Sequence, residues 1–220
     1  MNTLNFISIY SIVLPLILGV CFIKRLSNDA LLIWGIVVIG AIPQLAYPYL
    51  YRTKSLNTLY NLYVLFEFII SIFLFRNKFL YKKYSRIFNL TCCLYFLFAC
   101  MLIALKGITG KFLNELICLN SFLYILWILI ILLLQYSDDN YNEQIRKNVV
   151  FLWYMTSVFI YSLCTIMVFA FWQFIKNLSV STAHIVKAIH SVFNINLYVC
   201  ISIGIWLDKM YNVKALKPVE

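Results

Sequence analysis

The chain has 220 residues, of which 64% are hydrophobic and 12% charged, with a mean hydropathy of +0.89 and a formal net charge of +10. A soluble domain is about 45–50% apolar and about 25% charged, and one of this size could not bury so much apolar surface in a single core, so the bilayer must be the solvent. The positive charge does not indicate a nucleic-acid partner, because basic residues gather in the cytoplasmic loops of membrane proteins and no soluble domain remains to bind nucleic acid.

Seven hydrophobic runs are each long enough to cross about 30 Å of hydrocarbon as a helix. These runs are continuously apolar, whereas the strands of a membrane barrel alternate over about ten residues. The sequence therefore predicts an all-α fold, a single seven-helix transmembrane domain that covers residues 1–220. In chain order the predicted spans are 5–23, 30–50, 56–75, 87–105, 112–134, 149–175 and 180–207.

The first two runs carry local signals of their own. No basic residue precedes the first run, and Lys24 and Arg25 follow it, which is the reverse of a cleavable signal peptide. The second run contains Pro43 and Pro48. Proline lacks the backbone N–H and clashes with the preceding turn, so these positions predict a broken second helix.

The basic residues predict the orientation of the chain. With the N-terminus outside and the C-terminus cytoplasmic, twelve Lys and Arg residues fall in cytoplasmic segments and five in outer ones, as the positive-inside rule requires. We expect a multi-pass protein of the bacterial inner (plasma) membrane. One basic cluster is a candidate contact for anionic lipid or a cytoplasmic signalling protein. It comprises Arg76, Lys78, Lys82, Lys83 and Arg86.

A few polar residues lie inside the predicted spans, where ionisable groups are costly unless they face the bundle interior. Glu67 lies about halfway along the third run, and Lys187, His190 and Asn194 share an arc of about 60° on the seventh. They predict a polar pocket in the outer half of the membrane, with Glu67 facing Lys187 or His190. The other candidates for its wall are Gln44, Asn114 and Ser121. The same residues could instead join the helices to one another as structural hydrogen-bonding groups.

No pattern predicts catalysis, a metal site or a cofactor. The seven cysteines include no C-x-x-C pair, and the two histidines are six residues apart, about 240° around a helix. Hydrolase and nucleotide-binding motifs are absent from the sequence. We therefore do not expect an enzyme, and any enzymatic site would have to lie within the membrane.

The segments 59–68 and 190–198, with Gly204-Ile205-Trp206, resemble an uncharacterised group of small seven-helix bacterial membrane proteins from Bacteroidetes-type genomes. The resemblance implies a signalling context, because these proteins tend to accompany sensor kinases, and it implies no activity. The sequence leads to a small membrane sensor or signalling partner as its first hypothesis. The alternatives are a small-solute transporter, with or without proton coupling, and an oligomeric membrane-active accessory or defence protein.

Overall fold

The computed structural model describes residues 3–51, 53–79, 81–109, 111–170 and 180–215. Within these ranges the regular structure is helical and contains no strand. The elements are α1 (Thr3–Tyr10), α2 (Val13–Phe22), the 3₁₀ turn η1 (Ile23–Arg25), α3 (Asn28–Leu50), α4 (Lys54–Arg76), α5 (Lys82–Lys106), α6 (Asn114–Ser137), α7 (Asp139–Lys147), α8 (Val149–Ala170) and α10 (Val180–Ala215).

Seven segments of the described chain are long and apolar enough to cross a membrane. They correspond to the seven predicted runs, with α1, α2 and η1 together forming the first. The chain is therefore an integral membrane protein with several spans. Residues 171–175, the end of the sixth predicted run, lie outside the described residues.

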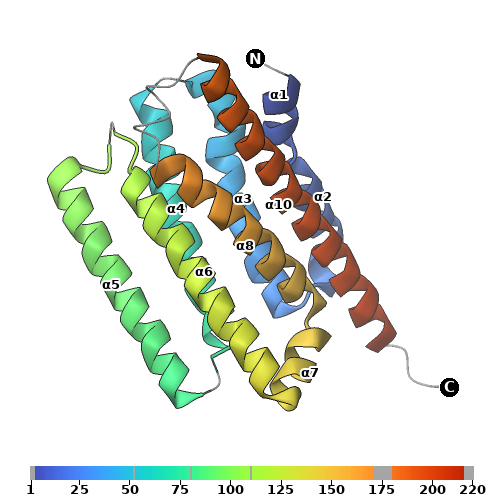
Figure 1. Ribbon diagram of the computed structural model, residues 1–220. Coiled ribbons are helices and arrows are strands. Elements are labelled where there is room, and N and C mark those ends of the chain that lie inside the picture. The colour runs from blue at the N-terminus through green and yellow to red at the C-terminus, as the bar shows by residue number, and fades with distance from the viewer. Residues whose placement is uncertain (1–2, 52, 80, 110, 171–179, 216–220) are drawn as a thin grey trace.

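The spans form one bundle, in which α8 packs between α6 and α10 while α5 lies at the edge against α6 and α4 (Figure 1). The N-terminus and the C-terminus lie at opposite ends. We call the end with Thr3 and the α3–α4 and α5–α6 connections the N-terminal face. The end with η1 and α7 is the C-terminal face.

The break in a spanning helix occurs in the first span and not in the second, where it was expected. Pro43 and Pro48 both lie inside the single helix α3. The first span instead divides at Ser11-Ile12 into α1 and α2. Pro15 lies in the first turn of α2, where its missing N–H is tolerated, and its ring would clash with the Ser11 carbonyl in a continuous helix. Pro15 is thus the physical reason for the break.

The half of the bundle nearer the C-terminal face is filled by aromatic rings. The Trp127 ring centroid lies 4.6 Å from that of Phe88 and 5.4 Å from that of Phe75. Phe75 also packs 5.6 Å from Phe151. All four side chains are almost completely buried, and Trp127 donates from Nε1 to Thr91 Oγ1 at 3.0 Å. Rings packed at these separations make this half a solid core.

The C-terminal face is held by paired polar groups. Lys78 Nζ lies 2.5 Å from Asp29 Oδ2 and 4.8 Å from the centre of the Phe151 ring, and Asn148 donates to the same Asp29 oxygen. Lys78 is therefore turned into the protein, although the sequence placed it in a lipid- or partner-binding cluster. The other four members of that cluster are exposed, namely Arg76, Lys82, Lys83 and Arg86.

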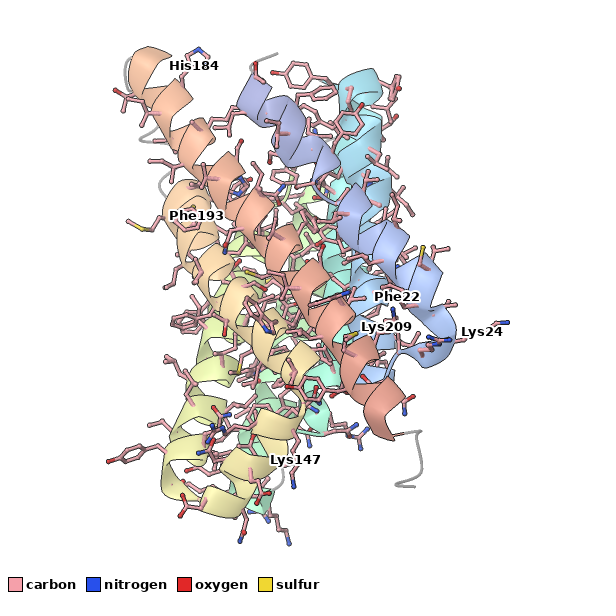
Figure 2. The ribbon with its side chains drawn as sticks, turned by 90° about the vertical axis from the view of Figure 1, so that its right-hand side faces the viewer. Phe22, Lys24, Lys147, His184, Phe193 and Lys209 are labelled. Carbon is pink, nitrogen blue, oxygen red and sulfur yellow. The ribbon has the colours of Figure 1, made fainter. Side chains whose placement is uncertain are left out.

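The last helix is attached to the same face. Asp208 on α10 accepts hydrogen bonds from Ser27, from its backbone N at 2.8 Å and from its hydroxyl at 2.9 Å. Lys209 Nζ lies 4.1 Å from the centre of the Phe22 ring on α2. Both residues are labelled in Figure 2, on neighbouring helices. These contacts fix the C-terminal half of α10 against α2 and the turn that precedes α3.

Candidate solute-binding cavity

The half of the bundle nearer the N-terminal face encloses a cavity of about 1540 Å³. Its walls come from α1, α3, α4, α6, α8 and α10. The sequence located the pocket on four of these helices, and α1 and α8 are additional. All seven pocket residues selected from the sequence line this one cavity: Gln44, Glu67, Asn114, Ser121, Lys187, His190 and Asn194.

The cavity opens at the N-terminal face. Its lining includes the exposed side chains of Tyr51, Lys111, His184 and Lys187. His184 lies near the start of α10, at the opposite end of the bundle from Lys147 and Lys209 (Figure 2). On the other side the cavity ends at the aromatic core. A solute could therefore enter from one face of the membrane and not pass directly to the other.

Glu67 is the deepest residue that α4 contributes to the lining. The described ion pairs include Lys78–Asp29, Lys106–Glu115 and Lys147–Glu143, and the expected pair of Glu67 with Lys187 or His190 is absent from them. Lys187 is exposed at the mouth of the cavity. The His190 ring instead packs against Tyr161, with 5.6 Å between the ring centroids.

Tyrosines surround the Glu67 carboxyl group. Tyr63, one turn earlier on α4, is its hydrogen-bonding neighbour. Four more tyrosines both line the cavity and lie close enough for the Glu67 charge to act on their hydroxyls; they are Tyr124, Tyr154, Tyr161 and Tyr198. The sequence analysis missed these four. Their position inside spans, away from the membrane interfaces that tyrosine prefers, is the signal that could have identified them.

Gln44 and Asn194 support the break in the first span. Ser8 carbonyl oxygen accepts hydrogen bonds from Gln44 Nε2 at 2.9 Å and Asn194 Nδ2 at 3.1 Å. Gln44 Nε2 also donates to the Ile9 carbonyl at 3.1 Å, and its Oε1 accepts from the Tyr198 hydroxyl at 2.8 Å. In lipid, backbone groups released from a helix need such partners. These two amides thus have a structural role, whatever else they contact.

Four polar atoms of the lining have no hydrogen-bond partner among the described residues, and all four are buried. They are Asn120 Oδ1, Tyr154 Oη, Thr165 Oγ1 and His190 Nε2. Of these four residues the sequence selected only His190, and beside Asn120 it selected Ser121 instead. Most buried polar groups in proteins are hydrogen-bonded, so an unpaired one in a cavity wall indicates a position where something else binds.

Asn61 holds the loop at the mouth. Its Nδ2 donates to the carbonyl oxygens of Ile108 at 2.9 Å and Lys111 at 2.8 Å, and its Oδ1 accepts from the Leu113 backbone N at 3.0 Å. Asn61 is 1% exposed, so these three bonds rigidly join the α5–α6 connection to α4. They keep Lys111 beside the opening of the cavity.

No protein family, curated protein or solved structure matches this chain. The resemblance to uncharacterised seven-helix bacterial proteins therefore stays a prediction. In the part of the chain that the structure describes, no three His, Cys, Asp or Glu side chains are grouped as a metal site would require. The functional argument rests on the cavity itself.

Proposed function

We propose that the protein is a membrane carrier for a small solute, which binds in the cavity of the N-terminal half. The observation that carries this proposal is the cavity of about 1540 Å³, open at one face and closed by the aromatic core, with Glu67 deep in its lining and in none of the described ion pairs. Sites for small molecules commonly measure about 300–1,000 Å³, so this one has room for a solute and its water. Ionisable residues inside a membrane mark solute or proton pathways.

The divided first span supports a carrier over a passive binding protein. Secondary transporters build their sites from discontinuous helices whose freed carbonyl groups face the site. Here the break at Ser11-Ile12 lies beside the cavity, which Ser8 and Ile9 both line. The carbonyl oxygens of these two residues accept hydrogen bonds from the Gln44 side chain. This flexible side chain could keep these hydrogen bonds if α1 changed its position.

The distribution of basic residues supports an outward orientation of the opening. Twelve Lys and Arg residues against five favour a cytoplasmic C-terminal face. In that orientation the cavity opens to the exterior of the cell, and the aromatic core forms the inner barrier. A transport cycle would require a second conformation, in which the outer opening is closed and the inner barrier is open. Glu67 would be the group whose charge a bound solute or a proton neutralises.

A receptor is the second candidate, because one helix joins the cavity to the other face. α10 runs without interruption through 36 residues, from the cavity residues Lys187 and His190 to Asp208 at the C-terminal face. A ligand that binds one position of α10 better than another would shift that face, as a sensor requires. An oligomeric pore is supported less well, because Glu67 and Asn120 face a cavity inside one chain and not the lipid.

The test is the thermal stability of the purified protein against a broad panel of metabolites and drugs, followed by uptake of the stabilising compounds into proteoliposomes. We expect at least one solute to stabilise the wild type and to accumulate in the vesicles. Glu67→Gln should lose at least tenfold in apparent affinity. Glu115→Gln is the matched control, since it removes a carboxylate outside the cavity lining. Stabilisation without uptake would favour the receptor, and a panel without any stabilising compound would contradict both.

A further inference from the structure

The inner part of the cavity offers hydrogen-bond acceptors to a ligand. Glu67 forms none of the described ion pairs, and Asn120 Oδ1 has no partner among the described residues. Asn120 is 4% exposed. A carboxylate inside the bundle without a charge partner is costly, and a cationic N–H donor relieves that cost with charge-assisted hydrogen bonds. The surrounding tyrosine rings also attract a cation through their faces.

Glu67 and Asn120 lie at about the same depth. Asn61 on α4 and Leu113 at the start of α6 are joined by a hydrogen bond of 3.0 Å, and both helices run from the N-terminal face inwards (Figure 1). Glu67 follows Asn61 by six residues and Asn120 follows Leu113 by seven, which places them about 9 Å and about 10.5 Å deeper at about 1.5 Å per residue. Both acceptors therefore lie at a similar level in the lining of one cavity.

The mouth offers the opposite charge. Lys111 and Lys187 line the opening, are exposed, and belong to none of the described ion pairs. Lys106, the last residue of α5, is by contrast paired with Glu115. Two basic side chains at the opening attract an anionic group and disfavour the entry of a simple cation. A simple anion would in turn meet Glu67 at the inner end.

The distance between the two charged regions sets the size of the ligand. The Lys111 backbone is hydrogen-bonded to Asn61, about 9 Å above Glu67 by the helical rise. An extended peptide spans at most about 3.3–3.6 Å per residue, so about three residues cover this distance. The cavity of about 1540 Å³ has room for such a ligand.

We propose that the solute is a zwitterion of about the size of a tripeptide, whose ammonium group binds Glu67 and Asn120 and whose carboxylate faces Lys111 and Lys187. This inference rests on the proposed function of the cavity as a solute site. It names a substrate class, a small peptide-like zwitterion, which neither a simple amine nor a simple acid satisfies.

The experiment compares three forms of one peptide on the full-length protein in detergent. Ala-Leu-Ala carries both charges, its N-acetyl form lacks the ammonium group, and its C-terminal amide lacks the carboxylate. Affinity is measured by isothermal titration calorimetry and by the shift in melting temperature. We expect the free peptide to bind at least tenfold more tightly than either blocked form. Equal affinity for all three forms, or tighter binding of a blocked form, would overturn the proposal.

Two variants assign the ends of the peptide. Glu67→Gln should weaken the free peptide at least tenfold and leave the N-acetyl peptide nearly unchanged. The double variant Lys111→Gln and Lys187→Gln should weaken the free peptide and leave the amide nearly unchanged. Lys106→Gln, at the same face but outside the lining, is the control and should change neither. A variant that weakens all three peptides equally would contradict the assignment of its residue. The blocked peptides test the proposal on the wild type even if a variant fails to fold.

The failure of this inference can be told from the failure of the proposed function. If the three peptides do not bind while another solute of the broad panel does, the zwitterion is wrong and the carrier proposal stands. If no compound of either set binds, the solute site itself is wrong.

Discussion

At the C-terminal face, Lys78 lies 2.5 Å from Asp29, and Asn148 donates to the same carboxylate. In the other half of the bundle, Glu67 is half-buried, borders a cavity of about 1540 Å³ and belongs to none of the described ion pairs. The two regions thus differ in whether a carboxylate inside the bundle has a charge partner within the protein.

The comparison separates polar groups that stabilise the fold from those that serve another purpose. At the C-terminal face, the charged groups are paired and the rings are closely packed, so this region offers no site for a ligand. The unpartnered atoms of Asn120, Tyr154, Thr165 and His190 in the cavity wall are costly to the fold unless water or a solute binds them. Four experiments can break or sharpen this comparison.

The largest effect is expected from the aromatic core. Trp127→Ala should lower the free energy of unfolding by about 3–5 kcal/mol, because it empties a closely packed site. Tyr161→Ala should cost clearly less, since it only enlarges a cavity that already exists. Thermal melts of both variants in the same detergent measure the difference. Equal losses would show that the two halves are packed alike.

The paired charges come next. Asp29→Asn leaves Lys78 without its charge partner in a site where the two side chains are 12% and 15% exposed. Breaking a buried pair costs about 3 kcal/mol or more. Glu143→Gln, which breaks the exposed pair with Lys147, should cost less than about 1 kcal/mol. A stability of Asp29→Asn equal to that of the wild type would remove the contrast between the faces.

Gln44→Leu tests the support of the broken helix. It removes the amide donor of the Ile9 carbonyl and the acceptor of the Tyr198 hydroxyl, and an unsatisfied buried group costs about 1–3 kcal/mol. We expect a melting temperature several degrees lower than that of the wild type, since about 1 kcal/mol shifts a protein of this size by about 2–4 °C. An unchanged melting temperature would mean that water replaces the amide freely.

The smallest effect concerns a solvated contact at the C-terminal face. The Tyr81 hydroxyl donates to Asp138 and, with the backbone N–H groups of Tyr141 and Asn140, holds the pKa of that carboxyl below its usual value of 3.8. A carboxyl group whose pKa is lower in the folded state than in the unfolded state stabilises the fold at pH values above its unfolded-state pKa. This stability is lost as the pH falls through the folded-state pKa. The stability difference between wild type and Tyr81→Phe should therefore be present at pH 6 and disappear below about pH 4. Melts across this range measure it, and a pH-independent difference would exclude the Asp138 carboxylate as its source.

The spans were predictable because a membrane helix needs a continuous apolar run of fixed length. The location of the broken helix was not, because the effect of a proline depends on its neighbours. α3 continues through Pro43 and Pro48, whereas Pro15 divides the first span. The position of a proline in the sequence does not show whether neighbouring helices supply partners for the backbone groups that the proline leaves without hydrogen bonds.

The convergence of the pocket residues was predictable, but their partners were not. Helical periodicity places Glu67 and His190 on inward faces, and the structure shows both in one cavity. Whether they pair depends on the tilt and separation of α4 and α10, which periodicity does not contain. Tyr154 was missed because tyrosine is also common in apolar packing. Asn120 was missed because it is adjacent to Ser121, and the helical period alone assigned Ser121 to the inward face.

The central claim is that Glu67 serves a solute and not the fold, and the melting temperature of Glu67→Gln without any added solute tests it most directly. Because Glu67 belongs to none of the described ion pairs, its replacement should leave the melting temperature equal to or above that of the wild type, while Asp29→Asn melts several degrees lower. A Glu67→Gln variant that melts as low as Asp29→Asn would contradict the account, because Glu67 would then be one more structural contact between helices.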